Sequence, residues 1–136
     1  MTTTAKEKTK LSGKISQIVG VVVDIDFFGG HLPAIYNALK VTADNRDILL
    51  EVAQHLSESS VRAVALSSTD GLERGAEVVD TGSAISVPIG EETLGRMFNV
   101  IGEPIDGKPA ANKAKKSPIH REPPAFTEQS NKTEIL

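Results

Sequence analysis

The chain has 136 residues, of which 39% are hydrophobic and 24% charged, and its formal net charge is −3; these values describe one ordinary globular domain, or a small domain with part of another. Its apolar runs are only a few residues long, which excludes a bilayer-spanning helix, so we expect any membrane association to come through partners. It has no cysteine, which excludes a disulfide framework and thiolate zinc sites and fits a reducing compartment.

Charge is distributed unevenly along the chain. Residues 1–10 carry three lysines and one glutamate without the features of a signal or transit peptide, and we interpret them as a disordered lead of a bacterial-type cytoplasmic chain. Residues 11–82 carry five basic and ten acidic residues, whereas residues 83–136 carry seven of each. An acidic segment repels phosphate backbones, so this distribution argues against nucleic-acid binding.

Residues 14–27 alternate between apolar and polar side chains, which is typical of half-buried strand. The predicted inward-facing side chains are those of Ile15, Val19, Val21, Val23, Ile25 and Phe27. The stretch is too long for one flat strand, so Gly20 predicts a bend or bulge between two strands. The glycines and proline of residues 28–33 predict a turn.

Four more short strands are predicted before residue 82. They cover residues 39–41, 47–55, 61–66 and 77–80, with Ile48, Leu50 and Val52 facing inward in the second of them. Turn residues separate the strands, and no connection is long enough for a crossover helix. About six short strands at this spacing predict a small closed antiparallel β-barrel over residues 11–82, because closure removes exposed sheet edges.

The pattern changes after Gly82. Residues 85–89 predict a short strand that its proline confines to an edge or an end. A helix is then predicted, with Glu91 and Glu92 in its first turn, Gly102 past its end, and one apolar face made of Leu94, Met97, Phe98 and Ile101. Residues 103–131 have no periodic pattern, and we expect them to be disordered or to wrap a surface outside this chain.

No catalytic motif is found in the sequence. The phosphate-binding pattern G-x-x-x-x-G-K-[ST] is absent, as are G-x-G-x-x-G, G-x-S-x-G and H-E-x-x-H. The three histidines, His31, His55 and His120, lie far apart and have no metal-ligand spacing. We therefore expect no catalytic, cofactor-binding or metal-binding residue in this chain.

The remaining charged groups each allow two interpretations. Asp24 and Asp26 could form a metal or acid–base pair, but a solvated outer face of the barrel is the simpler interpretation. Glu91 and Glu92 could be a carboxylate site, but favourable placement at a helix start is simpler. The lysines of residues 112–116 could bind an acidic partner or lie in a solvated loop.

Several longer stretches nevertheless resemble a known family. "GKISQIVGVVVDIDF", "LPAIYNAL", "LEVAQHL", "STDGLERG", "VVDTGSAISVPIGEETLGRMFNVIGEPIDG" and "IHREPPAFTEQS…TEIL" follow one another in order. Together they resemble the start of the catalytic β subunit of F-type ATP synthases, from about residue 13 to residue 136. Two departures are minor: Val21 stands where the family commonly has proline, and residues 67–69 differ from the usual wording before the "TDG" turn.

The resemblance implies a mainly β chain: a six-stranded antiparallel β-barrel over residues 11–82, then the incomplete start of an α/β nucleotide-binding domain over residues 83–136. In the family the barrel lies in the crown of a hexamer of alternating α and β subunits, on the cytoplasmic face of the bacterial inner membrane. The intact subunit uses ATP, ADP and Mg²⁺. The family's catalytic residues and its contacts with the central shaft lie downstream, so this chain alone is expected to be inactive.

A different class of function stays open. A free-standing small β-barrel of the oligonucleotide-binding type would offer stacking aromatics and a basic groove. The chain has one tyrosine, four phenylalanines and no tryptophan, and its predicted barrel is acidic. These counts disfavour the alternative without excluding it.

Overall fold

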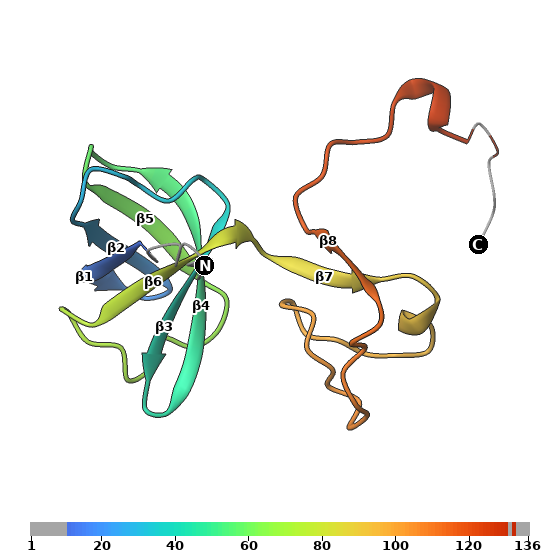
Figure 1. The fold of residues 1–136 in the computed structure, drawn as a ribbon, viewed down its shortest axis with the longest axis horizontal. Helices are drawn as coiled ribbons and strands as arrows, with labels where there is room; N and C mark the ends of the chain where they lie inside the picture. Colours follow the sequence, from blue (N-terminus) through green and yellow to red (C-terminus); the bar gives the residue numbers. More distant parts are fainter. Residues whose placement is uncertain (1–10, 131, 133–136) are drawn as a thin grey trace, which may run out of the picture.

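The computed structural model describes residues 11–130 and residue 132, so the expected disordered lead lies outside the described residues. Six strands form a closed antiparallel barrel in the order β1-β2-β5-β4-β3-β6 (Figure 1). Their bounds are β1 Ser12–Val19, β2 Val22–Phe27, β3 Asn37–Ala43, β4 Arg46–His55, β5 Ser60–Ala65 and β6 Glu77–Ala84. The mainly β fold and its six-stranded barrel, predicted from strand spacing and from the resemblance, are confirmed.

The barrel interior is filled by aliphatic side chains and one phenylalanine. Alternate residues of the strands point inward, as the period of two requires, and the predicted inner positions Ile48, Leu50 and Val52 are fully buried. The buried cluster consists of Ile15, Val23, Ile25, Phe27, Leu39, Val41, Ala43, Ile48, Leu50, Val52, Val61, Ala63, Ala65 and Val78. Full burial of one large aliphatic side chain stabilises a fold by about 1.5–3 kcal/mol, so this cluster is the main source of barrel stability.

The inner face predicted for residues 14–27 is right at four positions and wrong at two. The register of β1 against β2 shifts between Ile15 and Gln17, which marks a β-bulge. Past the bulge, Ile18 packs against the core and Val19 is 60% exposed. Val21 is 50% exposed because it lies in the turn at Gly20, where the predicted bend is found with a φ of 61°.

Beyond the barrel, the chain forms a two-stranded antiparallel ribbon of β7 (Ser86–Ile89) and β8 (Lys115–Pro118). Figure 1 shows the ribbon leaving the barrel directly after β6. The predicted strand at residues 85–89 is thus confirmed as β7. Residues 103–131 were expected to be disordered or to wrap a surface outside this chain. Their described part contains β8 and a short 3-10 helix, η2 (Phe126–Glu128), so the expectation of disorder is wrong for these elements.

The helix predicted around residues 94–101 is also wrong. Only one 3-10 turn forms, η1 (Glu91–Thr93), and Leu94 after it is already extended, with a φ of −66° and a ψ of 133°. Gly95 then takes a left-handed φ of 67°, which helical residues do not adopt. The Met97 amide bonds to the Asp106 carboxylate instead of to a carbonyl of a preceding turn. The apolar spacing that suggested a helix is therefore not matched by backbone hydrogen bonding.

Among the residues that the structure describes, no helix is long and apolar enough to cross a membrane.

Candidate functional site

The three histidines occupy separate places. His31 is exposed in the loop after β2. His55 Nε2 lies 2.7 Å from the carbonyl oxygen of Pro33, and His120 Nε2 lies 3.0 Å from Glu51 Oε2. Over residues 11–130 and 132, no group of three His, Asp or Glu side chains is placed to hold a metal ion.

Asp24 is not solvated, which corrects the interpretation of the two β2 carboxylates as an open outer face. Its side chain is 12% exposed and accepts two hydrogen bonds from Arg62 of β5, Nε to Oδ1 at 2.8 Å and Nη2 to Oδ2 at 2.9 Å. The hydrogen bond from Arg62 is the main cause that holds the pKa of Asp24 below its usual value. Asp26 is half-buried and stands opposite Lys14 in the ladder. Asp24 is thus bound to an arginine, not paired with Asp26.

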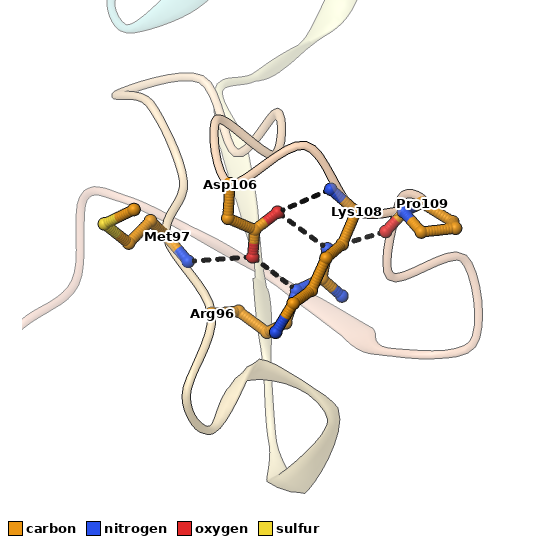
Figure 2. Close-up of polar contacts among 5 residues, drawn as sticks. All are labelled: Arg96, Met97, Asp106, Lys108 and Pro109. Atoms are coloured by element: carbon orange, nitrogen blue, oxygen red, sulfur yellow. Dashed lines mark hydrogen bonds and ion pairs between the residues drawn. The ribbon is translucent and has the colours of Figure 1, made fainter.

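The most densely bonded polar group lies in the segment between β7 and β8. Figure 2 shows the Asp106 carboxylate between the Arg96 guanidinium and the backbone amides of Met97 and Lys108. Arg96 Nε donates to Asp106 Oδ2 at 2.7 Å, the Met97 amide to Oδ2 at 3.3 Å, and the Lys108 amide to Oδ1 at 3.1 Å. Arg96 also donates to the Pro109 carbonyl at 2.6 Å. This Arg96–Asp106 cluster closes the loop of residues 96–109.

The electrostatics of the Arg96–Asp106 cluster suit a structural role. The two side chains are only 15% and 8% exposed. The hydrogen bond from Arg96 is the main cause that holds the pKa of Asp106 well below its usual range, with further lowering from the Lys108 and Met97 amides. A carboxylate that already accepts these bonds and resists protonation is a poor general base at neutral pH. The cluster therefore shapes a loop and has none of the features of a reaction centre.

The other candidate charges lie at the surface. Glu91 and Glu92 are exposed in η1, which has three residues, so the helix whose start they were expected to stabilise does not form. Of the lysines in residues 112–116, Lys115 and Lys116 belong to β8 and are exposed, which replaces the expected solvated loop with a strand. None of these groups has a buried partner that would define a site in the described part of the chain.

Exposed apolar side chains are the clearest candidates for contact with another molecule. On the barrel they include Val19, Val21, Phe28, Ile35 and Leu56, and beyond it they include Leu94, Met97, Val100, Ile105 and Phe126. Phe28 follows β2, Ile35 lies just before β3 and Leu56 follows β4, all at the barrel end from which β7 leaves. Leu94 is 76% exposed and Phe126 is 82% exposed, and such exposure of large apolar side chains indicates a surface that contacts another molecule.

Sequence reasoning missed the residues that link the two parts of the chain. The Tyr36 ring stacks on the His120 ring with centroids 3.8 Å apart, and Glu51 bonds to the same histidine. Tyr36 and Glu51 lie in two of the quoted family stretches, but nothing in those stretches marks either residue as a partner of His120, and 69 positions separate Glu51 from His120. The sequence indicated only that Glu51 faces outward on a predicted strand. Many surface residues share this position, so it could not identify the contact with His120.

One comparison with known proteins bears on these features. A model of the β-barrel domain of the ATP synthase alpha/beta family matches residues 15–82. The match covers half of the 136-residue chain and coincides with the observed closed barrel, from the buried Ile15 of β1 into β6. The chain therefore belongs to the ATP synthase alpha/beta family and carries its β-barrel domain near the N-terminus.

Proposed function

We propose that the chain is the N-terminal part of the catalytic β subunit of a rotary, proton-translocating ATP synthase. The observation that carries the proposal is the closed barrel at the residues that the family model matches. The sequence "VPIGEETLGRMFNVIGEPIDG" that follows the barrel supports the β over the α subunit, because its wording resembles the β type. In this proposal residues 83–136 begin the nucleotide-binding domain.

The barrel's proposed role is structural. A catalytic domain that opens and closes needs a fixed anchor, and a closed sheet with a fully buried aliphatic core is a rigid one. A ring of such barrels requires head-to-tail contacts between unlike surfaces. The proposed neighbours are α subunits, and the exposed apolar side chains at both barrel ends are suitable contact residues.

The remaining expectations belong to the same proposal. The intact subunit makes ATP from ADP and phosphate with Mg²⁺, whereas this chain alone holds neither nucleotide nor metal and is inactive. It reaches the central shaft only through downstream domains, and the membrane only through the complex, on the cytoplasmic face of the bacterial inner membrane. Nucleic acid is not a partner, since residues 11–82 carry five basic and ten acidic residues.

Two measurements on the purified chain test the proposal. Calorimetric titration with MgATP is expected to give no heat of binding, and micromolar affinity would contradict the assignment of an inactive structural part. Mixing with α subunits, followed by native mass spectrometry, is expected to give a mixed complex. Salt-sensitive retention of a single-stranded oligonucleotide in a filter assay, without α-subunit binding, would instead support the free-standing binding module.

A further inference from the structure

Past β8 the chain returns to the barrel at His120. The His120 ring stacks on Tyr36, which precedes β3, with centroids 3.8 Å apart and an interplanar angle of 19°. The ring nitrogen Nε2 lies 3.0 Å from Oε2 of Glu51, an outward-facing residue of β4 whose side chain is 19% exposed. The imidazole is thus held in two directions, by an aromatic face and by a carboxylate.

The backbone of Tyr36 is unusual in a way that serves this contact. Its φ is 72°, in the left-handed region that bulky residues rarely adopt. The Tyr36 amide donates to the Val52 carbonyl of β4 at 2.8 Å, and the Asn37 amide donates to the Ala34 carbonyl at 3.0 Å, so the turn is fixed. Tyr36 is strained and 48% exposed, so its conformation is better explained by what its ring touches than by packing in the barrel.

A second place where the segment comes near the barrel is on the same face of β4, two positions before Glu51. Leu49 is half-buried although its neighbours Ile48 and Leu50 fill the interior. Leu49 lines one pocket together with Val100 and Ile101, and it lines another with Ile101 and Lys116. The loop that carries Ile101 therefore faces Leu49 on the outer face of β4 across these small cavities.

The loop at residues 99–103 is held in shape before it reaches the barrel. Asn99 Oδ1 accepts hydrogen bonds from the amides of Ile101 at 3.1 Å and Glu103 at 2.8 Å. Asn99 Nδ2 donates to the Glu103 carboxylate at 3.0 Å. This network presents Ile101 at the tip of a preformed loop, which lowers the entropy lost on docking.

We propose that Tyr36, Leu49, Glu51, Ile101 and His120 form a latch that fixes the segment after β6 onto the outer face of β4. An isolated two-stranded ribbon such as β7–β8 is marginally stable in water, so it needs support from outside its own hydrogen bonds. The latch supplies that support through the stacked and hydrogen-bonded His120 side chain, and through the approach of Ile101 to Leu49. The orientation of the segment is thereby set by barrel residues and not by the β6–β7 connection alone. The latch does not depend on the proposed function of the chain.

The test uses the full chain and NMR spectroscopy, which its single tyrosine and three histidines make simple to assign. The wild type is expected to show NOEs between the Tyr36 and His120 rings. The variants Glu51→Ala and His120→Ala are expected to accelerate amide exchange at Ile119, which donates to the Ile85 carbonyl, by at least about threefold, while amides of β2 keep their rates. The matched controls Glu58→Ala and His31→Ala alter exposed residues and are expected to leave Ile119 unchanged.

Tyr36→Gly separates a latch from a merely structural tyrosine. Glycine relieves the left-handed strain, so the barrel melting temperature is expected to stay the same or rise, while exchange at Ile119 accelerates as in Glu51→Ala. A tyrosine needed only for barrel packing would give a lower melting temperature with unchanged Ile119 exchange. That result, or the absence of ring NOEs in the wild type, would overturn the proposal.

Discussion

Asp106 shows how one side chain can determine the path of a loop. It accepts hydrogen bonds from Arg96 and from the amides of Met97 and Lys108, which come from both sides of the same loop. The Asp106 carboxylate accepts a hydrogen bond from the Met97 amide, which in a helix would donate to a backbone carbonyl of the preceding turn. A carboxylate with strong local partners therefore outweighs the modest helix preference of an apolar pattern.

The first prediction concerns acid. The folded-state pKa of Asp106 is depressed, so its contribution to stability is fully present above the unfolded value of about 3.9 and is lost as pH falls through the lower folded value. The carboxyl group of Asp106 is expected to remain ionised at about pH 3, as followed by the chemical shift of its carboxyl carbon in NMR. Asp106→Asn is expected to accelerate exchange of the Met97 and Lys108 amides and to leave barrel amides unchanged. If the pKa of Asp106 in the wild type lay at the usual value for an aspartate, this account would be refuted.

The second prediction concerns Asp24 and Arg62 on the barrel. Arg62→Met keeps the aliphatic stem but leaves the buried Asp24 carboxylate without its two donors. The melting temperature is expected to fall at pH 7. Because the wild-type pKa of Asp24 is lowered, the contribution of the ion pair to stability is present above the pKa of the unfolded chain and disappears as pH falls. The difference in melting temperature between variant and wild type is therefore expected to narrow below about pH 4. Arg121→Met, outside the barrel, serves as the control; a gap that does not depend on pH would contradict the prediction.

At the scale of elements, alternation predicted the barrel strands well, since the side-chain period of two leaves a clear trace wherever one face is buried. It misplaced Val19, because a β-bulge shifts the period by one residue and the only visible hint was Gln17 on the expected inner face. β8 could not be found this way. Its four residues, "KKSP", form an exposed strand opposite β7 and bury no side chain fully, so no pattern marks them.

The candidate site was less predictable than the fold. The helix expected at residues 94–101 was based on apolar spacing, on Glu91 and Glu92 at its start and on Gly102 past its end. All of these features also occur in the irregular segment that is observed, where Leu94 and Met97 are exposed. The partners Arg96 and Asp106 are ten positions apart across a turn, and Glu51 meets His120 across the domain. Such contacts depend on tertiary structure and have no local sequence signal.

The third prediction compares two glycines of the same segment. Gly102 and Gly107 both have left-handed backbones, with φ of 80° and 73°. A Cβ on Gly102 would lie 2.7 Å from Pro88 Cδ and 3.2 Å from Val87 Cα, whereas one on Gly107 meets nothing within 4 Å. Gly107→Ala is expected to cost about 1 kcal/mol of local stability, and Gly102→Ala about 1–3 kcal/mol more, because the loop must move away from β7. Amide exchange in β7 measures the stability change caused by each variant. Equal changes for the two variants would contradict the close approach of Gly102 to β7.

At the scale of the whole molecule, the two parts of the chain differ in how they are stabilised. Of the described residues, those in the buried core cluster all lie between Ile15 and Val78, within β1 to β6. The segment after β6 depends on polar contacts, a short ribbon and the latch on β4. The dependence is therefore expected to run in one direction: the segment needs the barrel, but the barrel does not need the segment.

The fourth prediction follows from this asymmetry. Leu50 is fully buried on β4, between the latch residues Leu49 and Glu51. Leu50→Ala is expected to cost about 2–5 kcal/mol of barrel stability, and to accelerate amide exchange in the ribbon as well, since it loosens the strand on which the segment docks. Gly102→Ala is expected to affect the ribbon alone. Urea unfolding followed by barrel and ribbon amides separately distinguishes the two variants. If Gly102→Ala lowered the barrel midpoint as much as Leu50→Ala does, the two parts would form one cooperative unit and the one-way dependence would be wrong.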